Sequence, residues 1–75
     1  MSKILHVSVH AEERFMQRVF NTPLPSTNQL KLAGRLISIE VGTNELIDGV
    51  YPLPSFEGFK FIIKDNTVVT IRKEN

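Results

Sequence analysis

The run FEGFKFIIKDNTVVTIRKEN at the end of the chain constrains the fold more than any other segment. Two stretches rich in β-branched and aromatic residues flank Asp65-Asn66. These two residues tolerate the positive φ of a tight hairpin turn better than most residues do. The run therefore predicts an antiparallel β-hairpin that turns at Asp65-Asn66.

A two-residue turn at this point also sets the register of the hairpin. The expected cross-strand pairs are Ile63–Val68, Phe61–Thr70 and Phe59–Arg72. One face then carries four apolar side chains, Phe59, Phe61, Ile63 and Val68, and the other carries Lys60, Ile62, Val69 and Ile71. Because both faces are largely apolar, we expect the hairpin to lie in a sheet that is covered at least partly on each side.

The segment from Val9 to Phe20 has the periodicity of an amphipathic helix. Ser8 stands where an N-cap would stand, and Glu12 and Glu13 follow in the early turns, where the helix dipole favours negative charge. We expect the helix to stop at segment 21–25, because its two prolines lack backbone donors and disfavour helical geometry before them. Glu12 falls in the apolar sector of this helix, from which it could reach solvent or the hairpin.

A second helix is expected from about Asn28 to Ile37, with Ser26 or Thr27 as its cap. The segment 36–41, LISIEV, alternates at period two and is equally consistent with a strand.

Two short strands complete the expected fold, one at the sheet edge over residues 3–8 and one over Leu46 to Tyr51. Together these elements predict an α+β fold in a single domain, residues 1–75. One or two N-terminal helices pack on a small antiparallel sheet that ends in the C-terminal β-hairpin.

The composition limits the kinds of partner that the protein can have. Nine basic and eight acidic side chains leave a net charge of +1, so any recognition of an anion must come from a local cluster. The absence of cysteine excludes disulfides and thiolate metal sites. The N-terminal residues lack a signal-peptide pattern, and no apolar run approaches the roughly 20 residues that span a bilayer. We therefore expect a cytoplasmic protein that has no membrane partner.

The first predicted helix carries His10, Arg14 and Arg18 at four-residue steps, on one side with Gln17 and Asn21. Neither arginine has an acid at the spacing of three or four residues that helical ion pairs need. One interpretation is that the arginines are solvated or bridge to acids elsewhere in the fold. The candidate acids are Glu40, Glu45, Asp48 and Glu57. The other is a phosphate cradle, in which the guanidinium groups hold an anion and His10 transfers protons near neutral pH.

The residues HAEERFMQR resemble the opening helix of a group of short bacterial and phage-borne domains, in which His-Ala-x-x-Arg is followed by a second Arg four residues later. In that group a segment with glycine and a β-rich ending follow, to which FKFIIKDNTVVTIRK is similar. The group is placed near the RelE-type and colicin-type toxin ribonucleases. The resemblance implies a helix packed on an antiparallel sheet and cleavage of RNA without a metal or other cofactor.

By this resemblance His10 would be the general acid or base, and Arg14 and Arg18 would bind the phosphate and stabilise the transition state. Lys60 and Arg72 would be further phosphate-binding residues, and Thr70 and Lys64 would stand beside them on a second wall. The ribose 2′-OH would be the nucleophile, so this chemistry needs no metal.

A second class of function stays open: a non-catalytic protein of a phage or mobile element that binds a host protein or an antitoxin. The near-neutral charge suits it. A homodimer is a further alternative, since an uncovered hairpin edge invites pairing. His6 and His10 would form a metal pair only on one helix, and Ser8 is expected to begin the helix between them. An RNA-stacking function for the phenylalanines near Lys60 is disfavoured against packing in the core.

Overall fold

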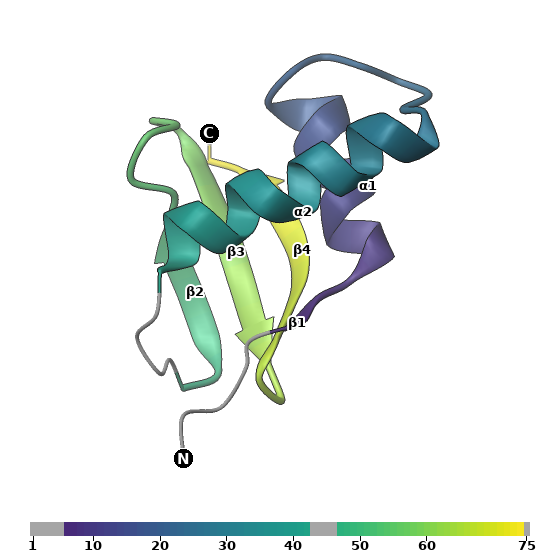
Figure 1. Ribbon diagram of the computed structural model, residues 1–75. Coiled ribbons are helices and arrows are strands. Elements are labelled where there is room, and N and C mark those ends of the chain that lie inside the picture. Colours follow the sequence, from purple (N-terminus) through teal and green to yellow (C-terminus); the bar gives the residue numbers. More distant parts are fainter. Residues whose placement is uncertain (1–5, 43–46, 75) are drawn as a thin grey trace.

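The computed structural model describes residues 6–42 and 47–74, which form two helices and a four-stranded sheet (Figure 1). The elements in chain order are β1 (His6–Val7), α1 (Val9–Arg18), α2 (Thr27–Val41), β2 (Gly49–Pro52), β3 (Phe59–Lys64) and β4 (Thr67–Lys73). The strands lie in the order β1-β4-β3-β2. The predicted α+β class is confirmed.

The sheet is mixed, whereas the sequence predicted an antiparallel one. β3 pairs antiparallel with β2 and with β4, but β1 runs parallel to β4. The expected edge strand over residues 3–8 is present at His6–Val7, and residues 3–5 lie outside the described residues. The strand expected over Leu46–Tyr51 begins later, at Gly49; Leu46 also lies outside the described residues.

The hairpin turns at Asp65-Asn66, as predicted, with φ of 50° and 59° at the two residues. The predicted pair Ile63–Val68 is confirmed. Beyond it the predicted register is wrong, because a bulge between Ile62 and Ile63 in the ladder shifts the rest by one residue. The observed pairs that replace the predicted ones are Phe61–Ile71 and Phe59–Lys73.

Because of this shift, Ile71 lies on the same face as Phe61 and Val68, not on the face assigned from the sequence. This face is the covered one: Phe61, Val68 and Ile71 are buried in the core together with Phe15 of α1 and Ile37 of α2. α2 crosses this face and α1 lies beside β4 (Figure 1).

The opposite face of the sheet carries no helix among the described residues, so no helix supplies the partial cover that was expected on that side (Figure 1). Cross-strand partners share a face, and the register therefore places Val50, Ile62 and Thr70 in one row on it. Pro52, Lys60 and Arg72 form the next row. Val50 is 50% exposed.

α1 begins as predicted and ends two residues earlier. The Ser8 hydroxyl accepts a hydrogen bond from the Ala11 N–H, which makes Ser8 the N-cap. Asn21 has a positive φ of 54°, and the Thr22 N–H donates to the Met16 carbonyl. This left-handed turn ends the helix before the first proline is reached.

α2 resolves the ambiguous segment 36–41 as helix. Ser26 is its N-cap, in a capping box with Gln29. Ile37 and Val41 are both buried, and they lie one helical turn apart on the inner side of α2.

The aromatic residues pack within the fold. The Phe56 ring lies edge-on to Phe15, with centroids 5.4 Å apart, and Phe61 stacks on Tyr51. Phe61 lies in the core and Phe56 and Phe59 pack against it, which confirms the prediction of core packing for these phenylalanines.

Candidate functional site

The three residues singled out in the sequence, His10, Arg14 and Arg18, lie along one flank of α1. At about 100° per residue, each of them is at least about 120° around the helix axis from Glu12, whose carboxylate lies against Gly34 of α2. The three residues, here called the α1 stripe, therefore share the flank turned away from α2. His10 and Arg18 are exposed and Arg14 is half-buried.

Arg14, the middle residue of the α1 stripe, donates hydrogen bonds to uncharged acceptors. Arg14 Nε donates to His10 Nε2 at 3.4 Å, and Arg14 Nη1 donates to Gln17 Oε1 at 3.1 Å. The Gln17 amide in turn donates to the Pro23 carbonyl at 3.2 Å. These contacts orient the guanidinium group of Arg14 but leave its charge without an acidic partner among the described residues.

No acid in the described part of the chain forms an ion pair with Arg14 or Arg18. Glu40 accepts two hydrogen bonds from Ser55, and Asp48 accepts one from the Asp65 N–H. Of the other two acids considered from the sequence, Glu57 forms no ion pair with a described residue and Glu45 lies outside the described residues. Bridging to the acids of the fold is therefore not seen among residues 6–42 and 47–74.

Lys60 and Arg72, the other predicted phosphate-binding residues, lie opposite each other on β3 and β4. The Lys60 ammonium forms an ion pair with Glu74 at 3.0 Å, so its charge is already matched. A cavity of about 240 Å³ lies at this pair and has no lining residue from α1. No described hydrogen bond or ion pair joins Lys60 or Arg72 to the α1 stripe.

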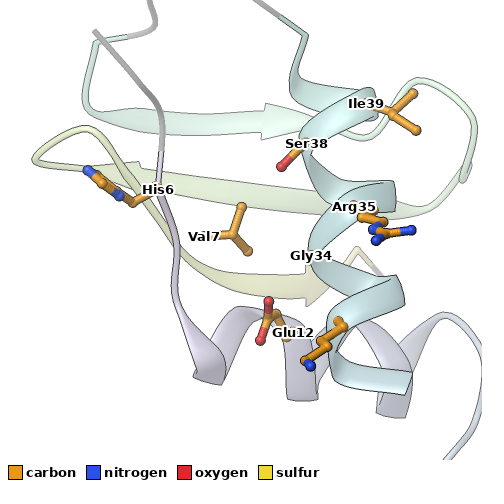
Figure 2. Close-up of a pocket in the computed structure, with 8 residues that line it drawn as sticks. His6, Val7, Glu12, Gly34, Arg35, Ser38 and Ile39 are labelled. Carbon is orange, nitrogen blue, oxygen red and sulfur yellow. The ribbon is translucent and has the colours of Figure 1, made fainter. Parts of the chain in front are cut away.

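A larger groove, of about 670 Å³, lies on the other flank of α1, between β1 and α2 (Figure 2). It is lined by His6, Val7, Glu12, Lys31, Gly34, Arg35, Ser38 and Ile39. Val7, Glu12 and Ser38 point toward the space between β1 and α2 in Figure 2. This groove, here called the Glu12 groove, was not assigned from the sequence.

Gly34 leaves space on α2 for the end of the Glu12 side chain at the Glu12 groove. A Cβ at position 34 would collide with Oε2 of Glu12, so the carboxylate occupies the place of a side chain on α2. Burial raises the pKa of Glu12 above its ordinary value. No described residue donates a hydrogen bond to this carboxylate or forms an ion pair with it.

The sequence contained a signal for this groove. Glu12 falls in the apolar sector of its helix, which marks an acid that is directed toward the rest of the fold. The contact partner could not be deduced, because it depends on the side of α2 that meets α1. A glycine inside a helix is a weaker signal on its own.

The described helices include none that is long and apolar enough to cross a membrane. Within residues 6–42 and 47–74, no cluster of three or more histidine and acidic residues could hold a metal ion. No protein-family model, curated protein or solved structure matches the chain.

Proposed function

We propose that the protein binds the phosphate backbone of RNA through the α1 stripe and cleaves it without a metal, in the manner of a small toxin-type endoribonuclease. The observation that supports this proposal is that Arg14 and Arg18 share one flank of α1 with His10 and have no acidic partner among the described residues. Guanidinium groups bind phosphate oxygens in a planar, two-pronged geometry.

The hydrogen bond from Arg14 to His10 can be replaced by one from Arg14 to a phosphate oxygen when RNA binds. At 3.4 Å and exposed to solvent it is long and weak, so little is lost when Arg14 Nε turns to a phosphate oxygen. This movement frees His10 Nε2 to accept a proton. A phosphate bound by Arg14 would thus prepare the base beside it.

The cleavage step transfers one proton to His10. His10 removes the proton of a ribose 2′-OH, the 2′ oxygen attacks the adjacent phosphorus, and the bond to the 5′ oxygen breaks. The products are a 2′,3′-cyclic phosphate and a 5′-OH end, whose proton comes from water because the α1 stripe holds one imidazole. Arg14 and Arg18 stabilise the negative charge that develops on the phosphate oxygens.

The proposal is tested with a single-stranded RNA oligomer, by fluorescence anisotropy for binding and by gel electrophoresis for cleavage. We expect Arg14→Ala and Arg18→Ala each to weaken binding by about tenfold, with a less steep salt dependence, by about 0.7 in the logarithmic slope. His10→Ala should keep the affinity and lose the cleavage.

The control is Lys73→Ala, which removes one positive charge from an exposed position on β4, outside both the α1 stripe and the Glu12 groove. RNA binding by Arg14→Ala and Arg18→Ala that equals binding by Lys73→Ala would contradict the proposal. If both stripe variants lose RNA binding but the unchanged protein leaves RNA intact at high concentration, the proposed RNA binding stands and the proposed cleavage is contradicted.

A protein partner is the second candidate, favoured by the apolar surface beside the end of α1. Phe20 is 46% exposed and Leu24 is 90% exposed, and both follow Arg18 closely in the chain. Exposed apolar side chains next to arginine are typical of protein interfaces. Under this alternative Leu24→Ser and Arg18→Ala both release a captured host protein, whereas RNA binding depends on Arg18 but not on Leu24.

A further inference from the structure

The Glu12 groove joins an inner carboxylate to an outer pair of cations. Glu12 and Gly34, both half-buried, lie at its inner side, and Lys31 and Arg35 are exposed. On α2, Lys31 lies about 60° and Arg35 about 100° around the axis from Gly34, so both cations stand on the outer rim. Neither forms an ion pair with Glu12.

This charge pattern restricts the ligand. One carboxylate and two cations give the groove a local charge of +1, which favours a ligand with net negative charge. The Glu12 carboxylate accepts hydrogen bonds only and lacks a described donor, so it is available to neutral hydroxyl or N–H donors of a ligand at the inner side. Val7 and the 72% exposed Ile39 add apolar surface, and the His6 ring lies at the edge.

We infer that the Glu12 groove binds a nucleoside phosphate with free 2′ and 3′ hydroxyls. The ribose hydroxyls donate to Glu12, the phosphate lies between Lys31 and Arg35, and the base rests on Val7 near the His6 imidazole. The volume of about 670 Å³ lies within the range of roughly 300–1,000 Å³ for pockets that bind small molecules. The same chemistry comes from a free mononucleotide or from the 3′-terminal nucleotide of an RNA. This site lies on the flank of α1 opposite the α1 stripe and does not depend on the function proposed above.

The test is an NMR titration of the isotope-labelled protein with each of the four nucleoside 5′-monophosphates. The backbone amides of Val7, Gly34 and Ser38 report on the groove. We expect saturable shifts at these amides, with adenosine and 2′,3′-dideoxyadenosine 5′-monophosphate each binding about tenfold more weakly than adenosine 5′-monophosphate.

Variants assign each part of the ligand to its residue. Arg35→Ala should weaken binding of the monophosphate about tenfold and leave binding of adenosine unchanged. Glu12→Gln should bind the ribose and dideoxyribose monophosphates alike, while Glu13→Gln keeps the difference. Gly34→Ala, which displaces the Glu12 carboxylate without a change of charge, should behave as Glu12→Gln does.

Two results would overturn the inference: no saturable shift with any of the four monophosphates, or a Glu12→Gln variant that still distinguishes the two sugars.

The source of the nucleotide is settled with RNA oligomers that end in a 3′-OH or a 3′-phosphate. A preference for the 3′-OH oligomer that persists in Arg14→Ala identifies an RNA end, and equal binding of both oligomers identifies the free nucleotide. The persistence in Arg14→Ala also separates this site from the α1 stripe.

Discussion

Gly34 lies on α2 against the Glu12 carboxylate of α1, so it affects both the contact between the helices and the acid of the Glu12 groove. A glycine inside a helix costs about 1 kcal/mol relative to alanine. At position 34 the absent side chain leaves the space that the Glu12 carboxylate occupies. The consequence for Glu12 is partial removal from water, which raises its pKa.

The raised pKa of Glu12 gives the stability a defined dependence on pH. Burial disfavours the ionised carboxylate in the folded state, so the unfavourable contribution is absent at low pH and present once Glu12 has ionised. Glutamine is neutral at every pH. We therefore expect the free energy of unfolding of Glu12→Gln, relative to that of the unchanged protein, to rise as the pH goes from about 3 to about 7.

Urea denaturation at several pH values measures this difference. Glu13→Gln is the matched control, because it removes the same charge from the same end of α1, where the helix dipole acts on both residues. The rise should be larger for Glu12→Gln than for Glu13→Gln. Equal curves for the two variants would show that the contact with Gly34 does not desolvate Glu12.

Both helices begin at a serine N-cap, but among the described residues only the cap of α1 also forms a hydrogen bond to another element. Ser26 makes a local capping box with Gln29, and both of its hydrogen bonds stay within the first turn of α2. The Ser8 hydroxyl accepts from Ala11 N–H and also donates to the Val69 carbonyl at 3.1 Å, which joins the start of α1 to the bulged part of β4.

These caps predict unequal costs of removal. Ser26→Ala should lower the free energy of unfolding by about 1 kcal/mol, the usual contribution of an N-cap. Ser8→Ala should lower it by about 2 kcal/mol, because a second hydrogen bond, to β4, is lost as well. Chemical denaturation of the two variants measures both values. Costs that are the same would mean that the bond to Val69 contributes nothing.

The bulge shows where sequence reasoning reached its limit. The turn at Asp65-Asn66 and the cap at Ser8 are local features, and they were predicted correctly because neighbouring residues decide them. For α2 the sequence left Ser26 and Thr27 as alternative caps, and the structure shows Ser26. The register beyond Ile63 is not local. Both strands contain adjacent β-branched residues, Ile62-Ile63 in β3 and Val68-Val69 in β4, so nothing in the pattern marks the extra residue that moves Ile71 to the covered face.

The candidate sites divide in the same way. The α1 stripe follows from helical spacing alone, and the structure keeps His10, Arg14 and Arg18 on one flank as expected. The Glu12 groove needs three elements, β1, α1 and α2, whose relative placement depends on packing between distant residues. The contact between Glu12 and Gly34 therefore cannot be predicted from the sequence before the packing of the helices is known.

At the scale of the whole molecule, the protein is a sheet with one covered face. Buried side chains from both helices and from β3 and β4 meet on that face, while Val50 and Ile62 lie on the other. A domain of this size has a small core, with a net stability of roughly 3–5 kcal/mol. Because the buried side chains lie on the covered face, we expect that face to contribute more to the free energy of unfolding than the open face does.

Two isoleucines of the hairpin test this asymmetry. Ile71 is fully buried on the covered face, and Ile62 is half-buried on the open face. Ile71→Val should lower the free energy of unfolding by about 1 kcal/mol, since the lost methylene leaves a cavity. Ile62→Val should change it by less than about 0.5 kcal/mol, because the site is partly solvated and valine suits a strand equally well.

Urea denaturation at two protein concentrations extends this comparison to the homodimer that the sequence left open. A second copy that covers the open face would bury Ile62, so the cost of Ile62→Val would approach that of Ile71→Val and stability would rise with concentration. A monomer would show the unequal costs at both concentrations. Equal costs with no dependence on concentration would contradict the observed register, because Ile62 and Ile71 would then be equally buried within one chain.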